Sequence, residues 1–240
     1  MADLIRSQKI ILASALVLVW VLESVIPFVQ GRSHRLQHAG RNLGLGLLNS
    51  VLSGLITVAL LTLVITRAEN SQFGLLRLLA LPDFAANIFA IFLLDGWMYL
   101  WHRANHVIPF LWSLHRVHHS DREMDVTTAV RFHPGEILIS TGLRLMLIAL
   151  LGLSLTQILL YDTLLVVVIF LHHSNIKFPV LLDNFLRKVI TTPTLHRVHH
   201  SIVSRETNSN FSSVFSFWDR LAGTFQLSVN QPTIVYGVEE

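Results

Sequence analysis

Residues 137–171, ILISTGLRLMLIALLGLSLTQILLYDTLLVVVIFL, form an almost continuously apolar stretch of 35 residues that is interrupted near Gly152-Leu-Ser154. A membrane-spanning helix needs about 20 consecutive apolar residues. The stretch is therefore too long for one helix, and its interruption predicts two helices that form a hairpin. Each of these helices is expected to be short for a complete crossing of the membrane.

Histidine clusters flank this hairpin, at residues 102–119 before it and at residues 172–200 after it. If the two groups of histidines share one site, the hairpin must return the chain to the side from which it started. It then contributes an even number of passes through the membrane. The pattern predicts a polytopic bundle of helices with the histidines at one end.

The composition of the chain indicates that lipid is its solvent. Of its 240 residues, 52% are hydrophobic and 14% are charged, and the mean hydropathy is +0.56. Soluble domains carry about 25% charged residues, so we expect one all-α membrane domain with no second, soluble domain. The pI is near 9.7, but the basic residues are scattered, and nucleic-acid binding is not expected.

Three apolar segments precede the first histidine cluster and predict three membrane-spanning helices, at residues 10–29, 43–66 and 84–100. The first follows a short basic head, which is also typical of a cleaved signal peptide. Because no small-residue cleavage site follows it, a retained helix is the favoured interpretation. Residues 72–83 are short and rich in leucine, and are expected to lie along the membrane interface.

Three spans before the clusters place the N-terminus on the face of the membrane opposite to the histidines. The loop after the first span carries Arg32, Arg35 and Arg41, and it falls on the same side as the histidines. Because cytoplasmic loops carry an excess of lysine and arginine, the metal site is predicted to lie on the cytoplasmic side. Arg6 and Lys9 in the N-terminal head oppose this orientation weakly.

Eight histidines form three tight clusters that suit metal binding. On a helix, residues three or four positions apart share a face, so each cluster can direct two or three imidazoles at one point. Neutral imidazole binds iron, copper, nickel and zinc, whereas the absence of cysteine excludes thiolate ligands and iron–sulfur clusters. Eight nitrogens exceed what one metal accepts and suit two. The clusters are His102 and His106, then His115, His118 and His119, then His196, His199 and His200.

The second and third clusters lie in one repeated heptapeptide, Leu-His-Arg-Val-His-His-Ser, at residues 114–120 and 195–201. The repeat is too short to be a solenoid unit, and two copies of one chelating turn predict two similar half-sites. Chance, or histidines at a membrane interface, would explain a single His-x-x-x-His. That alternative is a poor explanation for three histidine clusters, two of which lie in the same repeated heptapeptide.

The remaining histidines carry weaker signals. His172 and His173 follow the hairpin, and one of them, His173 by preference, is expected to be a ninth ligand. His133 precedes a Pro-Gly pair and is expected to begin a helix or to support a ligand, with peripheral ligation as the alternative. His34 and His38 lie among arginines in the first loop and are expected to be solvated.

Two acidic residues lie inside apolar segments, where a charge is costly and usually has a function. Asp95 precedes His102 by seven residues, and Asp162 precedes His173 by eleven, both close to whole numbers of helical turns. Each acid is predicted either to accept a hydrogen bond from the second ring nitrogen of a ligand or to make a hydrogen bond between helices.

The order and spacing of these motifs resemble the fatty acid hydroxylase/sterol desaturase superfamily over roughly residues 84–226. The resemblance rests on the three clusters, on His173-Ser-Asn175, on Arg131-Phe-His133-Pro-Gly-Glu136 and on the tail Trp218-Asp-Arg-Leu-Ala-Gly-Thr224. Ala222 stands where relatives often have an aromatic residue. We therefore divide the chain into N-terminal membrane helices (1–83), a hydroxylase-like catalytic region (84–226) and a C-terminal tail (227–240).

The resemblance implies a helical membrane fold with a non-haem site of two iron ions on its cytoplasmic side. It implies that O₂ and two electrons are used to attack an unactivated C–H bond of a sterol, fatty acyl chain, sphingoid base or ether lipid. Because His133-Pro-Gly alone is no cytochrome b5 domain, the electrons are expected from a separate donor, cytochrome b5-like or ferredoxin-like. Hydroxylation and desaturation share their first step, so histidine spacing does not separate them.

Two other classes of membrane protein also carry histidines on helices. A b-type cytochrome needs paired axial histidines well inside its spans. A metal transporter is expected to hold its ligands near the middle of the membrane. Here the histidines lie mostly at the ends of the predicted spans or outside them, which favours the oxidase.

Overall fold

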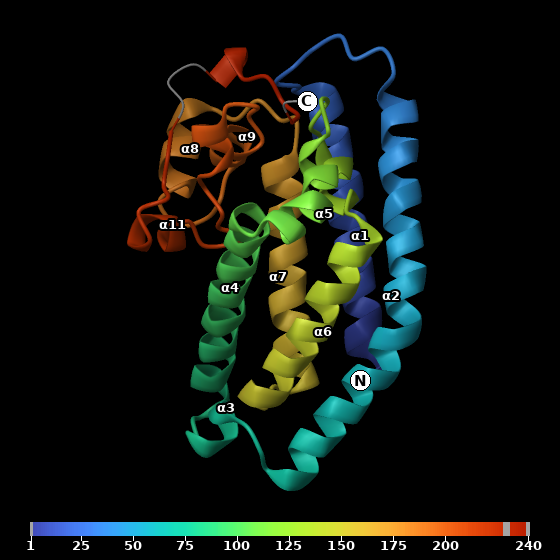
Figure 1. Cartoon of the computed structure of the whole chain (residues 1–240), viewed down its shortest axis with the longest axis vertical. Helices are drawn as coiled ribbons and strands as arrows, with labels where there is room; N and C mark the ends of the chain where they lie inside the picture. Colours follow the sequence, from blue (N-terminus) through green and yellow to red (C-terminus); the bar gives the residue numbers. More distant parts are fainter. Residues whose placement is uncertain (1, 228–230, 239–240) are drawn as a thin grey trace.

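The computed structural model of the chain describes residues 2–227 and 231–238, and every regular element within them is a helix. Residues 228–230 and 239–240 of the predicted tail lie outside the described residues. Five long helices form the body of the molecule (Figure 1). They are α1 (Ala2–Val25), α2 (Arg35–Ser71), α4 (Asp83–Val107), α6 (Pro134–Leu151) and α7 (Leu155–His173).

The long helices α1, α4, α6 and α7 are each long and apolar enough to cross a membrane. Helix α2 also qualifies if its halves, Arg35–Gly54 and Thr57–Ala68, which meet at 45°, are counted as one span. The predicted polytopic helical bundle is thereby confirmed. Helices α6 and α7 have 18 and 19 residues, about 27–29 Å at 1.5 Å per residue. These lengths are close to the roughly 20 residues that a spanning helix needs, and both helices are long enough to cross. The expectation that each is short for a complete crossing is therefore wrong.

The turn between α6 and α7 is built around Gly152, where the sequence predicts a break. Gly152 has a φ of +68°, in the left-handed region where glycine commonly ends a helix. Ser154 then caps α7 by accepting a hydrogen bond from the amide of Gln157. Gly74 packs against this turn so closely that a Cβ on it would lie 2.3 Å from the Cα of Gly152. The backbone before α3 (Leu75–Leu78) therefore lies directly on the hairpin.

The apolar core of the bundle lies between α4, α6 and α7. Its buried members include Leu94 on α4, Ile148 on α6, and Ile158 and Leu165 on α7. Helix α1 packs against the same α7. Many other large apolar side chains of the long helices are exposed, as expected for a surface that faces lipid.

Short helices gather at one end of the bundle, where α1 ends and α2 begins (Figure 1). The N-terminus lies toward the other end, beside the lower part of α2. From this end, α2 runs away and α4 returns, then α6 runs away and α7 returns, so the hairpin brings the chain back to the end that carries the short helices. These are α5 (Pro109–His119), η1 (Val126–Val130), α8 (Val180–Leu186), α9 (Pro193–His199), α10 (Ser204–Thr207), α11 (Phe217–Leu221) and η2 (Gln231–Thr233).

Helix α2 begins at Arg35, eight residues before the predicted start of the second span. Its first turns therefore belong to the folded body rather than to a loop. His38 is half-buried and lies between the carboxylates of Asp121 and Asp125. The expectation that His38 is solvated is wrong, whereas His34 is exposed as expected.

Candidate metal centre

Nine histidines converge at this end of the bundle in two adjoining groups. Within each group, one ring nitrogen of every residue lies within 4.8 Å of the others. The rings of His119 and His200 stack with their centroids 4.4 Å apart and join the two groups. Group A is His102, His106, His115, His119 and His199, and group B is His118, His173, His196 and His200. The structure thus brings together all nine histidines that the sequence indicates as ligands.

The convergence follows from where the helices begin and end. His102 and His106 lie in the last two turns of α4, and His173 is the last residue of α7. The two heptapeptides occupy α5 and α9, and each of these helices has a proline at its start. Proline at the first position fixes the backbone for a helix without losing a hydrogen bond. Two short helices can therefore present the repeated clusters toward the ends of α4 and α7.

The two heptapeptides interlock across the centre. The first gives its i, i+4 pair, His115 and His119, to group A, and its i+3 residue, His118, to group B. The second gives the pair His196 and His200 to group B, and His199 to group A. Each copy therefore supplies two nitrogens to one group and one nitrogen to the other. This exchange agrees with two similar half-sites that are built from a repeated turn.

The outer nitrogen of five of these imidazoles is held by an oxygen atom. A neutral imidazole has one N–H, so an Nδ1 that donates its hydrogen leaves a free lone pair on Nε2. This arrangement directs Nε2 of each ring into the centre. The Nδ1 partners are the carbonyl oxygens of Phe211 for His102 (2.8 Å), Arg131 for His118 (3.2 Å), Ile169 for His173 (2.9 Å) and Ser209 for His199 (2.7 Å), and the Glu136 carboxylate for His115 (2.8 Å).

Pairs of these Nε2 atoms face one another at short distances. Nε2 of His102 lies 2.9 Å from that of His199, and Nε2 of His118 lies 3.2 Å from that of His173. Because both members of each pair donate from Nδ1, two lone pairs point at each other and repel. A cation between them would remove this repulsion, and imidazole nitrogen suits iron or zinc. The donor set therefore fits metal ions.

Burial keeps the imidazoles in the form that binds metals. It lowers the pKa of His199 to about 3. Burial, aided by neighbouring histidines, also holds the pKa of His196 and of His200 well below its usual range. These rings are therefore neutral at physiological pH, and a metal can bind them without first displacing a proton.

Glu136 supports the centre, although the sequence did not single it out as a site residue. Its Oε1 accepts hydrogen bonds from Nδ1 of His115 at 2.8 Å and from the Asn105 amide at 3.3 Å. It lies in the first turn of α6, which His133 caps by accepting a hydrogen bond from the amide of Gly135. The available sequence signal was its place in the Arg131–Glu136 motif, two residues after Pro134.

Replacing Glu136 with alanine is expected to reduce metal affinity or activity by about 10–100-fold, the usual effect of losing a partner that orients a ligand. His115 would keep its place on α5 but lose the acceptor that fixes its ring. Asp3→Ala, which removes an exposed acid near the N-terminus, is the control. Metal bound per folded chain is the measurement, and equal metal content in both variants would contradict this role for Glu136.

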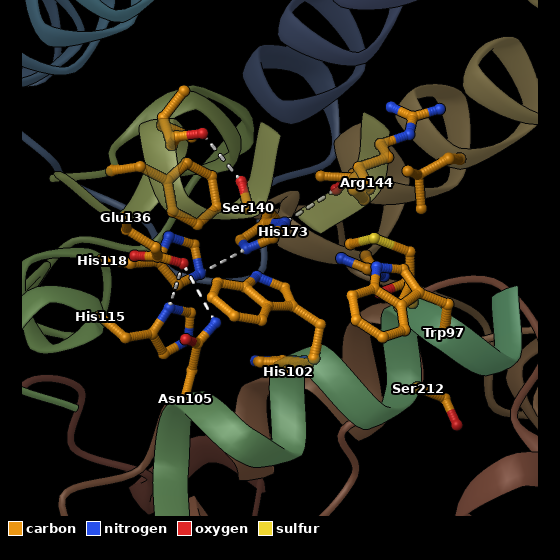
Figure 2. A pocket seen from close by; sticks show the side chains of 18 of the residues that line it. Trp97, His102, Asn105, His115, His118, Glu136, Ser140, Arg144, His173 and Ser212 are labelled. Atoms are coloured by element: carbon orange, nitrogen blue, oxygen red, sulfur yellow. Dashed lines mark hydrogen bonds and ion pairs between the residues drawn. The ribbon is translucent and has the colours of Figure 1, made fainter. Parts of the chain in front are cut away.

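A cavity of about 260 Å³ adjoins the histidines. Its walls come from α4, α6 and α7, with apolar side chains such as Trp97, Trp101, Leu165 and Ile169. Figure 2 shows His102, His115, His118 and His173 gathered at one end of it, together with Asn105 and Glu136. The centre therefore opens onto an apolar space between helices that are suited to span the membrane.

Residues 87–224 match the sequence profile of the family described as Fatty acid hydroxylase. The match covers more than half of the chain. The chain belongs to the fatty acid hydroxylase family. The superfamily resemblance seen in the sequence is thereby confirmed. No solved structure was found to match the chain.

Several relatives in this family are lipid-modifying enzymes by name. The ornithine lipid hydroxylase OlsE of Rhizobium tropici is 34% identical over 53% of this chain and 38% of its own length. Human alkylglycerol monooxygenase is 28% identical over 93% of this chain and 46% of its length. The sphingolipid C4-hydroxylase sur2 of Schizosaccharomyces pombe is 30% identical over 57% of this chain and 46% of its length. The chain spans less than half the length of these relatives.

The Trp218–Thr224 tail, part of the fatty acid hydroxylase match, supports His102 indirectly. Asp219 accepts hydrogen bonds from the amides of Phe211 and Ser212, at 2.8 and 3.0 Å, and from the hydroxyl of Thr224 at 2.8 Å. It thereby fixes the backbone whose Phe211 carbonyl accepts from Nδ1 of His102. In this member of the family the tail motif holds a segment that orients the candidate ligand His102.

The two acids within apolar segments do not contact the histidines that were predicted as their partners. Asp95 accepts from Trp218 Nε1 (2.9 Å), the amides of Phe215 (3.0 Å) and Val214 (3.2 Å), and the Tyr161 hydroxyl (3.1 Å). Asp162 pairs with Arg144 across the hairpin. The alternative of hydrogen bonding between elements is correct for both. Asp95 does share a face with His102, but seven residues separate them by about 10 Å along the helix.

His172 and His133 have distinct places beside the centre. The ring of His172 stacks on that of His196 with centroids 3.9 Å apart, but neither of its nitrogens joins group A or group B. His133 is the N-cap of α6, which agrees with the expectation that it begins a helix. The structure therefore brings His173, and not His172, into the candidate ligand set.

Proposed function

We propose that the chain is a membrane-bound hydroxylase that uses O₂ to oxidise a C–H bond of a lipid-like substrate at a dinuclear iron centre. The observation that carries this proposal is the pair of histidine groups set against an apolar cavity between membrane-spanning helices. The names of the relatives, which specify ornithine lipid, sphingolipid and alkylglycerol, support a lipid substrate. We place the catalytic region at residues 84–226.

Groups A and B would each hold one iron ion, through five and four imidazoles respectively. Two irons bound there would supply, with O₂ and two electrons, the oxidising power that an unactivated C–H bond requires. The protein fixes the ring orientations through the oxygen partners of Nδ1, because such partners set the tautomer and direct the ligating nitrogen. Glu136 does this for His115, and carbonyl oxygens do it for His102, His118, His173 and His199.

The cavity would position the substrate and exclude water from the reacting carbon. Its apolar walls suit an alkyl or sterol-like chain that enters from the bilayer. His106, Trp112 and Arg116 line a second cavity of about 330 Å³, which shares no lining residue with the first. We propose this cavity for electron delivery by a separate donor, and, following the arginines of residues 32–41, we propose that it faces the cytoplasm.

Hydroxylation is favoured over desaturation because the relatives are named as hydroxylases or monooxygenases. The two reactions share hydrogen abstraction and differ in the step that follows. A metal transporter or a b-type cytochrome is less well supported. The candidate ligands lie at the end of the bundle, whereas transport sites lie near the middle of the membrane.

Protein purified from iron-replete cells is expected to carry close to two metal ions per chain, because the nine imidazoles form two separate groups. Total metal is the relevant quantity, since zinc can replace iron during purification. Elemental analysis of folded protein in detergent measures it. A well-folded preparation that binds no more than one metal after reconstitution would contradict the dinuclear site.

A further inference from the structure

An ion pair lies inside the membrane-spanning hairpin, away from the metal centre. Arg144 on α6 donates to the carboxylate of Asp162 on α7. Arg144 is ten residues from the start of α6, and Asp162 is seven residues from the start of α7, so both lie well within their spans. Charged side chains at this depth are costly, and they commonly mark a route or a site for a substrate.

Arg144 also lines the cavity that adjoins the histidines. Glu136, Ser140, Thr141 and Arg144 lie along one helix and all line this cavity. Figure 2 shows Glu136 beside the histidines and Arg144 at the far end of this row. Eight residues separate Glu136 from Arg144, about 12 Å along the helix. The cavity therefore has a metal end and, about 12 Å from it, a charged end.

The ion pair leaves hydrogen-bonding capacity unused. Among the described residues, Nη2 of Arg144 bonds Asp162, and its Nε and Nη1 have no other partner. The two side chains remain 28% and 26% exposed. The paired charges cancel, so this end favours a neutral group that can both accept from arginine and donate to aspartate. A hydroxyl group does both, whereas an ionised carboxylate can accept from Arg144 but cannot donate to Asp162, whose charge repels it.

We propose that the Arg144–Asp162 pair binds a hydroxyl group of the substrate and thereby selects which carbon reaches the histidines. The substrate class is a neutral lipid with a hydroxyl group separated from the oxidised carbon by a chain that can span the two turns of α6 between Glu136 and Arg144, about 12 Å. This inference rests on the proposed function, because it takes the cavity to be the substrate site. It assigns the pair a role in specificity, in addition to its contact between α6 and α7.

Binding of two matched probes tests the proposal without turnover. The probes are a straight-chain primary alcohol with bromine on its far end, and the bromoalkane of the same length without the hydroxyl. Bromine quenches tryptophan fluorescence, and Trp97 and Trp101 line the cavity. The wild-type protein, purified after expression with iron, is expected to bind the alcohol about tenfold more tightly than the alkane, as one hydrogen bond to a charged group allows. Equal affinities would overturn the proposal, whether or not any variant folds.

Variants then test whether the Arg144–Asp162 pair causes the tighter binding of the alcohol. Arg144→Gln is expected to bring the alcohol close to the affinity of the alkane and to leave alkane binding unchanged. The exchange of both residues, Arg144→Asp with Asp162→Arg, is expected to retain part of the preference. Arg6→Gln, which removes an exposed arginine of α1, is the matched control and should retain all of it. If Arg144→Gln weakens both probes equally, the ion pair only holds the hairpin together and the proposal fails.

Metal content, measured on the same samples, separates this inference from the proposed function. A wild-type protein that prefers the alcohol but binds no metal would support the hydroxyl site and contradict the oxidase. A protein that binds two metals and shows no preference for the alcohol would support the dinuclear centre and contradict the hydroxyl site.

Discussion

Replacing His118 or His199 with alanine is expected to reduce turnover to background and to lower the bound metal. Each is the one histidine that its heptapeptide sends to the opposite group. Its loss removes the middle imidazole of a three-histidine cluster and opens a coordination position on a metal. It also removes a contact between the two heptapeptides. Nε2 of His199 also faces that of His102 at 2.9 Å, and Nε2 of His118 faces that of His173 at 3.2 Å. Hydroxylated lipid in expressing cells, measured by mass spectrometry and normalised to folded protein, reports the effect.

The control for these substitutions is His34→Ala, because His34 is exposed. It should have nearly wild-type activity and metal content. His118→Ala and His199→Ala with activities similar to that of His34→Ala would show that these histidines are not essential ligands. The oxidase interpretation would then lose its main support.

The parts of this structure that depend on local patterns could be predicted from the sequence. The length of the apolar segments and the break at Gly152 predict the hairpin, because a spanning helix needs a fixed length and glycine ends it. The spacing of three and four residues predicts that each histidine cluster shares one face. If the clusters share one site, the parity of the spans requires an even number of passes between them, which the hairpin supplies. None of these inferences needs the relative placement of distant segments.

The division of the histidines between two groups does depend on that placement. Spacing alone cannot reveal that His118 joins the second heptapeptide's pair, because the answer depends on how α5 and α9 pack. Asp95 illustrates the same limit. Its spacing placed it on the face of His102, but not at the same level along the axis. Glu136 reaches His115 because α6 begins beside α5, a contact that no local pattern encodes.

His38→Ala is expected to destabilise the protein strongly, contrary to the solvated role that its sequence context predicted. Its Nε2 lies 2.7 Å from Asp121 Oδ1 and its Nδ1 lies 3.1 Å from Asp125 Oδ2. Both nitrogens donate only when the ring is charged, so His38 balances two carboxylates that are almost fully buried. Removing one partner of a buried ion pair costs about 3–5 kcal/mol, a large part of a total stability of about 5–15 kcal/mol.

The network around His38 also reaches the metal centre. Asp121 accepts a hydrogen bond from Thr128, and the segment that follows ends at Arg131. The carbonyl oxygen of Arg131 accepts from Nδ1 of His118. A helix outside the family match thus holds the loop that orients a candidate ligand, so His38→Ala should lower metal content as well as stability.

Denaturant unfolding in detergent, compared with His34→Ala, measures the loss, and its pH dependence identifies the cause. Burial acts to raise the pKa of Asp121, but the hydrogen bond and charge of His38, together with hydrogen bonds from the Glu123 amide and the Thr128 hydroxyl, outweigh it and leave this pKa well below its usual range. A carboxyl with a lowered pKa stabilises the fold above its unfolded value of about 3.9, and this contribution disappears as the pH falls. His38→Ala should therefore have a lower free energy of unfolding at neutral pH than the wild-type protein. In acid, its free energy of unfolding should change less with pH than that of the wild-type protein. Adding Asp121→Asn to His38→Ala should recover part of the stability, because it removes one uncompensated charge. If His38→Ala unfolds at the same denaturant concentration as His34→Ala, the buried network contributes nothing to stability.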